Sequence, residues 1–306
     1  MTRMTSDDFP AFRPLTGIYE PSAVQQLADG RFLVVEDEKQ HPFSLVTIGA
    51  DGSAGSTALD LADDALRKLD DLEGLTLGHS GHIYAITSHS RDGDGEAKKS
   101  RDKLVRFRIE DNSVLAPVVV DSLKAALIAA HPVLATAAGI LDVKAEGGLN
   151  IEALEITPDQ QQLLIGFRSP LLGQRAIIAG IENPAAIFDT GESPRIGTTL
   201  ETLDLGGHGI RGMAYIPSLD GYLVISGPAA REQVQFRLWF WSGGRGDPVR
   251  LVTVPGLQGL EHAEGVCAAV LDGEQRIVIV SDDGSREAGR FARFLLLDVG
   301  QLQLGP

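Results

Sequence analysis

Charged residues recur at equivalent places in five similar segments of this chain, and their types suggest chemistry at a shared site. The position near the start of each segment carries, in chain order, Ser22, Glu73, Glu152, Arg211 and Glu264. Carboxylate and guanidinium groups that converge in this way can hold a hard cation, exchange protons with a substrate, or pair with one another.

Further polar residues accompany these positions. Asn150 and His262 lie two residues earlier in their segments, on the same side of a strand because side chains alternate with a period of two. The ends of the second apolar runs add four more candidates: Ser88, His89, Arg168 and Asp282. We therefore predict a ring of acids that is interrupted by arginines and histidines.

Each of these residue types fits a definite role in hydrolysis of a small molecule. The predicted catalytic residues are Glu73, Glu152, Glu264, His89 and His262. The predicted substrate-binding residues are Arg168, Arg211, Ser88 and Asn150. The predicted metal ligands are Glu73, Glu152, Glu264 and Asp282, with calcium or another divalent cation as the cofactor.

A structural interpretation competes with the catalytic one. Each glutamate could pair with an arginine, serine, asparagine or backbone amide of the neighbouring segment and simply hold the ring together. No GxSxG elbow and no CxxC or HExxH zinc spacing is present to favour a particular reaction.

The elements that must position these residues are strands. Segments such as DLEGLTLGHSGHIYAITSHS from Asp71 and GIRGMAYIPSLDGYLVISGPA from Gly209 each contain two apolar strands joined by a turn. Repetition of this unit predicts an all-β fold, a single β-propeller domain over residues 1–306. Five four-stranded blades use the whole chain, and six blades are the alternative count.

Two details of the propeller also follow from the sequence. The last copy lacks a fourth strand of its own, and Phe12–Ile18 is expected to supply it and so close the ring. Residues 122–138 are rich in alanine and leucine and predict a helical insertion between the second and third blades. Pro132 is expected to kink or split this helix because proline lacks the amide donor.

Composition limits the classes of partner. The 306-residue chain has a formal net charge of −15 and no basic cluster of the kind that nucleic-acid binding requires. No apolar run approaches the roughly 20 residues of a membrane-spanning helix, and no secretory leader is recognised. The single cysteine, Cys267, fits a reducing cytoplasm. We expect a cytoplasmic protein with a small-molecule ligand, no nucleic acid and no membrane, and a protein partner remains open.

Several of the same segments resemble a known family. NIEAL, FRSPL and SHSR are the most specific parts of a pattern that is similar to a bacterial β-propeller family catalogued as a domain of unknown function. The Glu-Gly-apolar openings and Ser-Asp ends are more distantly similar to phytase-like esterase and sugar-lactonase propellers.

The resemblance implies a propeller, and its distant part implies metal-dependent hydrolysis. The hypothesis is therefore a hydrolase of a small phosphoester, ester or lactone that acts at the mouth of the central channel. The alternative is a non-enzymatic propeller that binds a small ligand or a protein.

Overall fold

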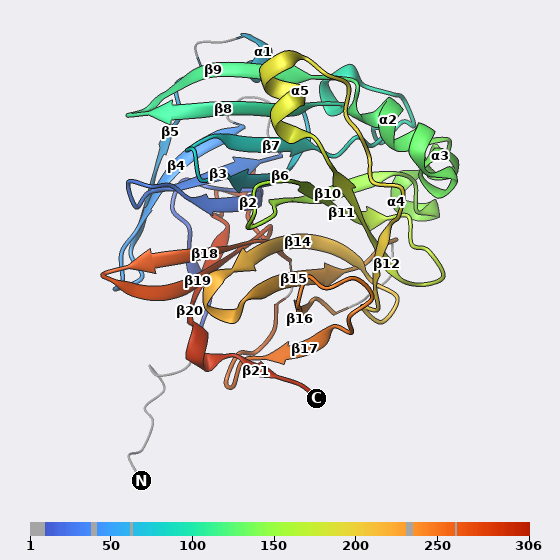
Figure 1. The fold of residues 1–306 in the computed structure, drawn as a ribbon. Helices are drawn as coiled ribbons and strands as arrows, with labels where there is room; N and C mark the ends of the chain where they lie inside the picture. The colour runs from blue at the N-terminus through green and yellow to red at the C-terminus, as the bar shows by residue number, and fades with distance from the viewer. Residues whose placement is uncertain (1–9, 38–41, 62–63, 231–234, 261) are drawn as a thin grey trace.

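The computed structural model describes residues 10–37, 42–61, 64–230, 235–260 and 262–306, and it is a β-propeller (Figure 1). The described strands form five antiparallel sheets. The first strands of these sheets, β2, β6, β10, β14 and β18, contact one another in chain order, and β18 contacts β2. The prediction of five blades is confirmed, and the alternative of six is wrong.

In blades 1 to 3 the strands follow the order of the chain from the axis outwards. Blade 1 contains β2 (Pro21–Gln26), β3 (Phe32–Glu36), β4 (Phe43–Ile48) and β5 (Ala54–Ala58). Blade 2 contains β6 (Leu72–Leu77), β7 (Ile83–Thr87), β8 (Leu104–Glu110) and β9 (Ser113–Val120). Blade 3 contains β10 (Asn150–Ile156), β11 (Leu163–Ser169), β12 (Ala176–Ile181) and β13 (Glu201–Leu203).

The last two blades include both ends of the described chain. Blade 4 contains β14 (Gly209–Ile216), β15 (Gly221–Gly227), β16 (Arg237–Trp241), β17 (Arg250–Thr253) and β21 (Gln303–Leu304). Blade 5 contains β18 (Ala263–Leu271), β19 (Glu274–Ser281), β20 (Arg293–Asp298) and β1 (Arg13–Pro14). The predicted closure is confirmed because β1 pairs with β20. The added edge strand β21 was not predicted.

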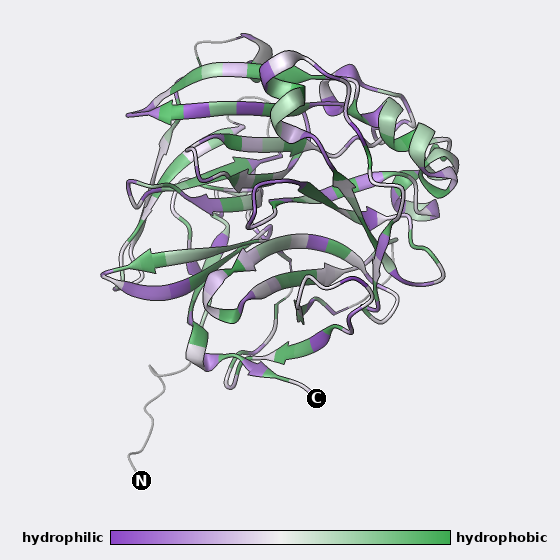
Figure 2. Ribbon diagram, in the orientation of Figure 1, coloured by the Kyte–Doolittle hydropathy of each residue, from purple (hydrophilic) through white to green (hydrophobic). Residues whose placement is uncertain are grey.

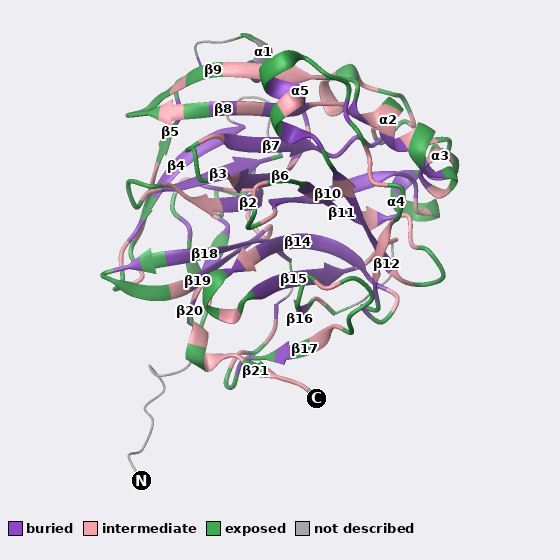
Figure 3. Cartoon of the chain, viewed as in Figure 1, coloured by how far each residue is buried: buried purple, intermediate pink, exposed green. Residues whose placement is uncertain are grey.

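Apolar packing between blades holds the ring. The second strands β3 and β7 are buried along their whole length, as expected for strands covered on both faces. Phe43 of blade 1 meets Phe107 of blade 2 edge to face, with ring centroids 5.3 Å apart. Apolar stretches recur along the strands (Figure 2), and the strands in the middle of the blades are largely buried (Figure 3).

Helices occupy the connections rather than the blades. The predicted insertion is confirmed as two helices, α2 (Leu123–Ala130) and α3 (Pro132–Ala138), divided at the extended residue His131. The others are α1 (Asp64–Arg67), α4 (Val143–Glu146) and α5 (Pro184–Thr190), with 3₁₀ turns at Lys99–Arg101, Pro217–Leu219 and Val299–Gln301. Within the described ranges, no helix has the length and apolar character needed to span a membrane.

Candidate functional site

A β-bulge in every blade delivers the recurring residues to the channel. The pairing of first and second strands skips one residue in each blade, and the skipped residues are Ser22, Glu73, Glu152, Arg211 and Glu264. A bulge residue leaves the hydrogen-bond ladder, which lets the strand turn its side chain to a new direction. The repeated bulge explains why these five positions share one environment.

Small residues follow the bulges because the inner strands approach closely there. A Cβ at Gly212 would lie 1.8 Å from the carbonyl oxygen of Glu264, and one at Gly74 would lie 2.8 Å from the amide nitrogen of Leu154. Only glycine fits such gaps. In blade 3 the position holds Ala153, whose ladder partner is Gly166 and therefore leaves room for the methyl group.

A polar pocket of about 350 Å³ lies at this mouth of the channel, and all five bulge residues line it. Seven of the residues predicted from the sequence converge there: Glu73, Glu152, Glu264, Arg168, Arg211, Asn150 and Asp282. Arg168 is also skipped in the pairing of β10 with β11, so a second bulge directs it to the same pocket.

Three predicted residues are not among those lining the pocket. His89 is fully buried, and its Nδ1 lies 2.8 Å from the carbonyl oxygen of Thr87. Burial lowers the pKa of His89 to about 4, so the ring is neutral at physiological pH. Ser88 is buried and donates to Asp71, and His262 stacks against Phe236 with ring centroids 5.9 Å apart.

Glu152 is the centre of an ion-pair network that joins blades 3, 4 and 5. Its Oε2 lies 2.8 Å from Arg211 Nε, and its Oε1 accepts from Arg211 Nη1 at 3.2 Å. Arg168 Nη1 and Asn150 Nδ2 also donate to Oε1, at 3.1 and 2.8 Å. Arg211 Nη2 reaches on to Glu264. The network fits the structural interpretation for these charges.

The predicted metal ligands do not fit a cation site in this arrangement. The guanidinium of Arg211 lies between the carboxylates of Glu152 and Glu264 and supplies the positive charge there. The described part of the chain contains no group of three or more His, Cys, Asp or Glu side chains placed to hold a metal ion. The residues present therefore do not fit calcium or another divalent cation.

Other carboxyl groups of the pocket are left without such partners. Glu73, Asp37 and Asp282 line it, and their carboxyl oxygens make no hydrogen bond or ion pair with another described residue. Burial, followed by the charge of Glu152, raises the pKa of Glu73 well above its ordinary value. Loss of hydration among the surrounding protein groups, followed by the negative charge of Asp71, raises the pKa of Asp37 to about 7. The side of Asp37 that faces solvent is nevertheless exposed. Burial also raises the pKa of Asp282.

Four more residues line the pocket although no catalytic, binding or metal role was predicted for them: Asp37, Arg91, Arg101 and Lys144. Asp37 ends the second strand of blade 1, the same signal that marked Asp282 in blade 5, so it was within reach of the repeat argument. Arg101 pairs with Asp71 at 2.9 Å and lies in a loop with no repeat counterpart. Lys144 belongs to α4, and no pattern in the sequence places that helix beside the channel.

The fold and the site together define a five-bladed β-propeller with a pocket of acids and arginines at one channel mouth. The chain belongs to the family described as "Protein of unknown function (DUF3616)", whose profile matches residues 121–293, more than half of the sequence. The family expected from the resemblance is confirmed. No curated protein matches the chain.

Solved structures resemble this chain in fold at low sequence identity. The major allergen Mala s 1 of Malassezia sympodialis aligns with a TM-score of 0.50 and 11% identity, over 92% of each chain. The PQQ-bound aldose sugar dehydrogenase of Streptomyces coelicolor gives 0.45 and 14%, over 96% of this chain and 98% of that one. A gluconolactonase of Xanthomonas campestris gives 0.43 and 10%, over 96% and 90%. At such identities the likeness concerns the fold alone.

Proposed function

We propose that this protein is a hydrolase of a small ester, phosphoester or lactone that works by acid–base catalysis in the channel-mouth pocket. The observation that carries the proposal is the carboxyl group of Glu73. It faces a polar pocket with no hydrogen bond or ion pair from the described residues, while its counterpart Glu152 is held by two arginines.

The carboxyl groups divide into an acid and a base. The raised pKa of Glu73 favours its protonated form, in which it can protonate the oxygen of a leaving alcohol. Asp37 titrates near pH 7 and can take a proton from an attacking water. Water adds to the carbonyl carbon or phosphorus, the bond to the leaving oxygen breaks, and both carboxyl groups regain their starting states by exchange with solvent.

Other residues support binding of the substrate. Arg168 uses Nε for the carbonyl oxygen of Pro228 and Nη1 for Glu152, and Nη2 has no partner among the described residues. This free N–H group can stabilise negative charge on the substrate oxygen. Asn150 Oδ1 is buried and lacks a hydrogen-bond partner in the described part of the protein, so it can accept from a substrate hydroxyl.

A substrate screen with a matched pair of variants tests the proposal. The probes are p-nitrophenyl acetate, p-nitrophenyl phosphate and a δ-lactone. Glu73→Gln keeps the shape but removes the acid, and we expect kcat/KM to fall by about a hundredfold or more. The control is Glu155→Gln, a glutamate of an inner strand that is buried and does not line the pocket, and it should leave kcat/KM unchanged. Equal activity in wild type and Glu73→Gln, or no hydrolysis of any probe, would contradict the proposal.

A non-enzymatic ligand-binding propeller is the second candidate. The observation in its favour is the network through Glu152, Arg211 and Glu264, which engages charges in contacts between blades. In that case Glu73→Gln should change ligand affinity and no probe should be hydrolysed.

A requirement for added calcium in the substrate screen would contradict the metal-free mechanism proposed for the hydrolase.

A further inference from the structure

The rim of the pocket carries two cationic side chains without a carboxylate partner in the described residues. Arg91 follows β7, and its guanidinium is held by the carbonyl oxygens of Ala138 at 3.2 Å and Gly95 at 3.0 Å. Lys144 is exposed on α4. Both line the channel-mouth pocket, and neither has a counterpart in another blade.

The remaining cations of the pocket are already paired. Arg101 contacts Asp70 and Asp71, Arg168 contacts Glu152, and Arg211 contacts Glu152 and Glu264. A guanidinium that is paired with carboxylates attracts a further anion less strongly, although Arg168 keeps the N–H groups of Nη2 free. Arg91 and Lys144 therefore differ from Arg101, Arg168 and Arg211 in having no carboxylate partner among the described residues.

The two acids of the same rim are also engaged locally. Asp92 contacts Lys98 at 3.0 Å, and its Oδ1 accepts from the amides of Asp94 and Glu96. Asp142 Oδ1 accepts from the amide of Ala145 at 3.0 Å and caps α4. Hence neither carboxylate is paired with Arg91 or Lys144.

We propose that Arg91 and Lys144 form a subsite for the anionic group of a small organic acid, a carboxylate or a phosphate. A guanidinium and an ammonium that line one pocket supply charge-assisted donors for such oxygens. The same pocket also carries the protonatable carboxyl groups of Glu73 and Asp37, which favour an uncharged hydroxyl, ester or lactone. The prediction that the anion binds does not depend on the proposed function, whereas the position of the reacting bond rests on the proposed function.

Isothermal titration with inorganic phosphate and with lactate, at low ionic strength, tests the subsite. We expect wild-type protein to bind at least one of them, and Arg91→Gln and Lys144→Gln each to weaken binding about tenfold. The two titrations distinguish a phosphate site from a carboxylate site. Arg91→Gln also removes the contacts of Arg91 with the carbonyl oxygens of Ala138 and Gly95. Lys144→Gln keeps the test decisive, because the exposed side chain of Lys144 makes no such contact.

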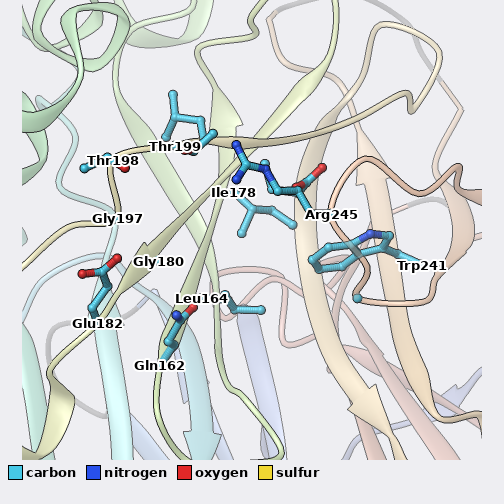
Figure 4. Close-up of a pocket in the computed structure, with 13 residues that line it drawn as sticks. Gln162, Leu164, Ile178, Gly180, Glu182, Gly197, Thr198, Thr199, Trp241 and Arg245 are labelled. Carbon is cyan, nitrogen blue, oxygen red and sulfur yellow. The ribbon is translucent and has the colours of Figure 1, made fainter.

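Two variants serve as matched controls. Arg245 lies exposed in a separate hollow of about 340 Å³ between blades 3 and 4 (Figure 4), so Arg245→Gln removes the same group from another concave surface. Lys68 is an exposed lysine that does not line the channel-mouth pocket, so Lys68→Gln matches the lysine variant. Both controls should bind the anions as the wild type does.

The outcomes separate this proposal from the proposed function. Binding that is unchanged by Arg91→Gln and Lys144→Gln, or that is lost in Arg245→Gln, overturns the subsite. Absence of binding of both anions to wild-type protein overturns it as well. Anion binding of the expected pattern without hydrolysis of any probe supports the subsite and contradicts only the hydrolase.

Discussion

Glu73 and Glu152 are the same residue type at equivalent positions of adjacent blades. Glu152 is paired with two arginines, whereas Glu73 has no such partner among the described residues. Blades follow the chain around the ring, so the neighbours of Glu152 are Glu73 and Arg211, and the neighbours of Glu73 are Ser22 and Glu152. Only Glu152 has a cation beside it. Position in the ring, rather than residue type, decides which carboxylate is neutralised and which is left to take up a proton.

The pair of Asp37 and Glu73 predicts a pH profile. A base must be deprotonated, so kcat/KM should rise with pH through about 7, where Asp37 loses its proton. It should fall again at higher pH as Glu73 ionises. Asp37→Asn should lower kcat/KM and remove the rise on the acidic side. A pH–rate series on both proteins measures this, and an acidic limb that persists in Asp37→Asn would assign it to another group.

At the scale of elements, β10 serves the site at one end and carries a buried acid near the other. All of its residues are buried, including Glu155. Burial raises the pKa of Glu155 to about 8. The amide of Tyr215 and the hydroxyl of Thr76 lower this pKa, but by less than burial raises it. A strand buried on both faces therefore keeps this carboxyl group protonated at neutral pH.

Glu155 should make stability depend on pH. Because its pKa is higher in the folded state, the folded protein binds the proton more tightly, and this stabilisation is lost as pH rises from about 4.5 to about 8. The Glu155→Gln variant cannot ionise at this position. The difference between its free energy of unfolding and that of the wild type should therefore increase over this pH range, by on the order of 4 kcal/mol in favour of the variant. Urea unfolding at several pH values measures the difference. A difference that does not vary with pH would contradict the protonated state.

A second element-scale prediction concerns the bulge in blade 4. The hypothetical Cβ of Gly212 clashes with the carbonyl oxygen of Glu264 on the neighbouring inner strand. Gly212→Ala should therefore push β14 and β18 apart and destabilise the protein by roughly 2 kcal/mol or more. Gly30→Ala, in a turn where a Cβ meets nothing within 4 Å, is the comparison for loss of a glycine with positive φ. Equal melting temperatures of the two variants would count against close approach at the axis.

At the scale of the whole molecule, both described chain ends tie blade 5 to its neighbours. The strand β1 pairs with β20 of blade 5 before the chain enters blade 1. After β20 the chain crosses to blade 4, where β21 pairs with β17. These contacts fix the ring in the closed form that brings the bulge residues together.

Removing these end strands should cost stability unequally. Deletion of residues 1–14 takes away β1, including the pairing of Arg13 with Phe294, and leaves blade 5 with three strands. We expect the free energy of unfolding to fall by about 2 kcal/mol, the contribution of a few backbone hydrogen bonds. Deletion of residues 303–306 leaves blade 4 with four strands and should cost less. A larger loss from the second deletion would mean that the outer edge, rather than closure, stabilises the ring.

The sequence by itself determined the propeller fold, favoured five blades over six, and predicted that a strand from the N-terminal region closes the ring. Repeats report local strand and turn propensities, and these act through neighbouring residues that are visible in the chain. The same repeat placed Glu73, Glu152, Arg211 and Glu264 at one channel mouth, because equivalent positions of a closed ring must converge. It also marked His89, which the structure buries away from the pocket.

Only the tertiary structure decided how the converging charges combine. The pairing of Arg211 with both Glu152 and Glu264, the isolation of Glu73, and the arrival of Arg91 and Lys144 at the rim depend on contacts between residues distant in the chain. The physical reason is that charge pairing and desolvation act through space over a few ångströms, whereas periodicity describes only the order of residues along the chain.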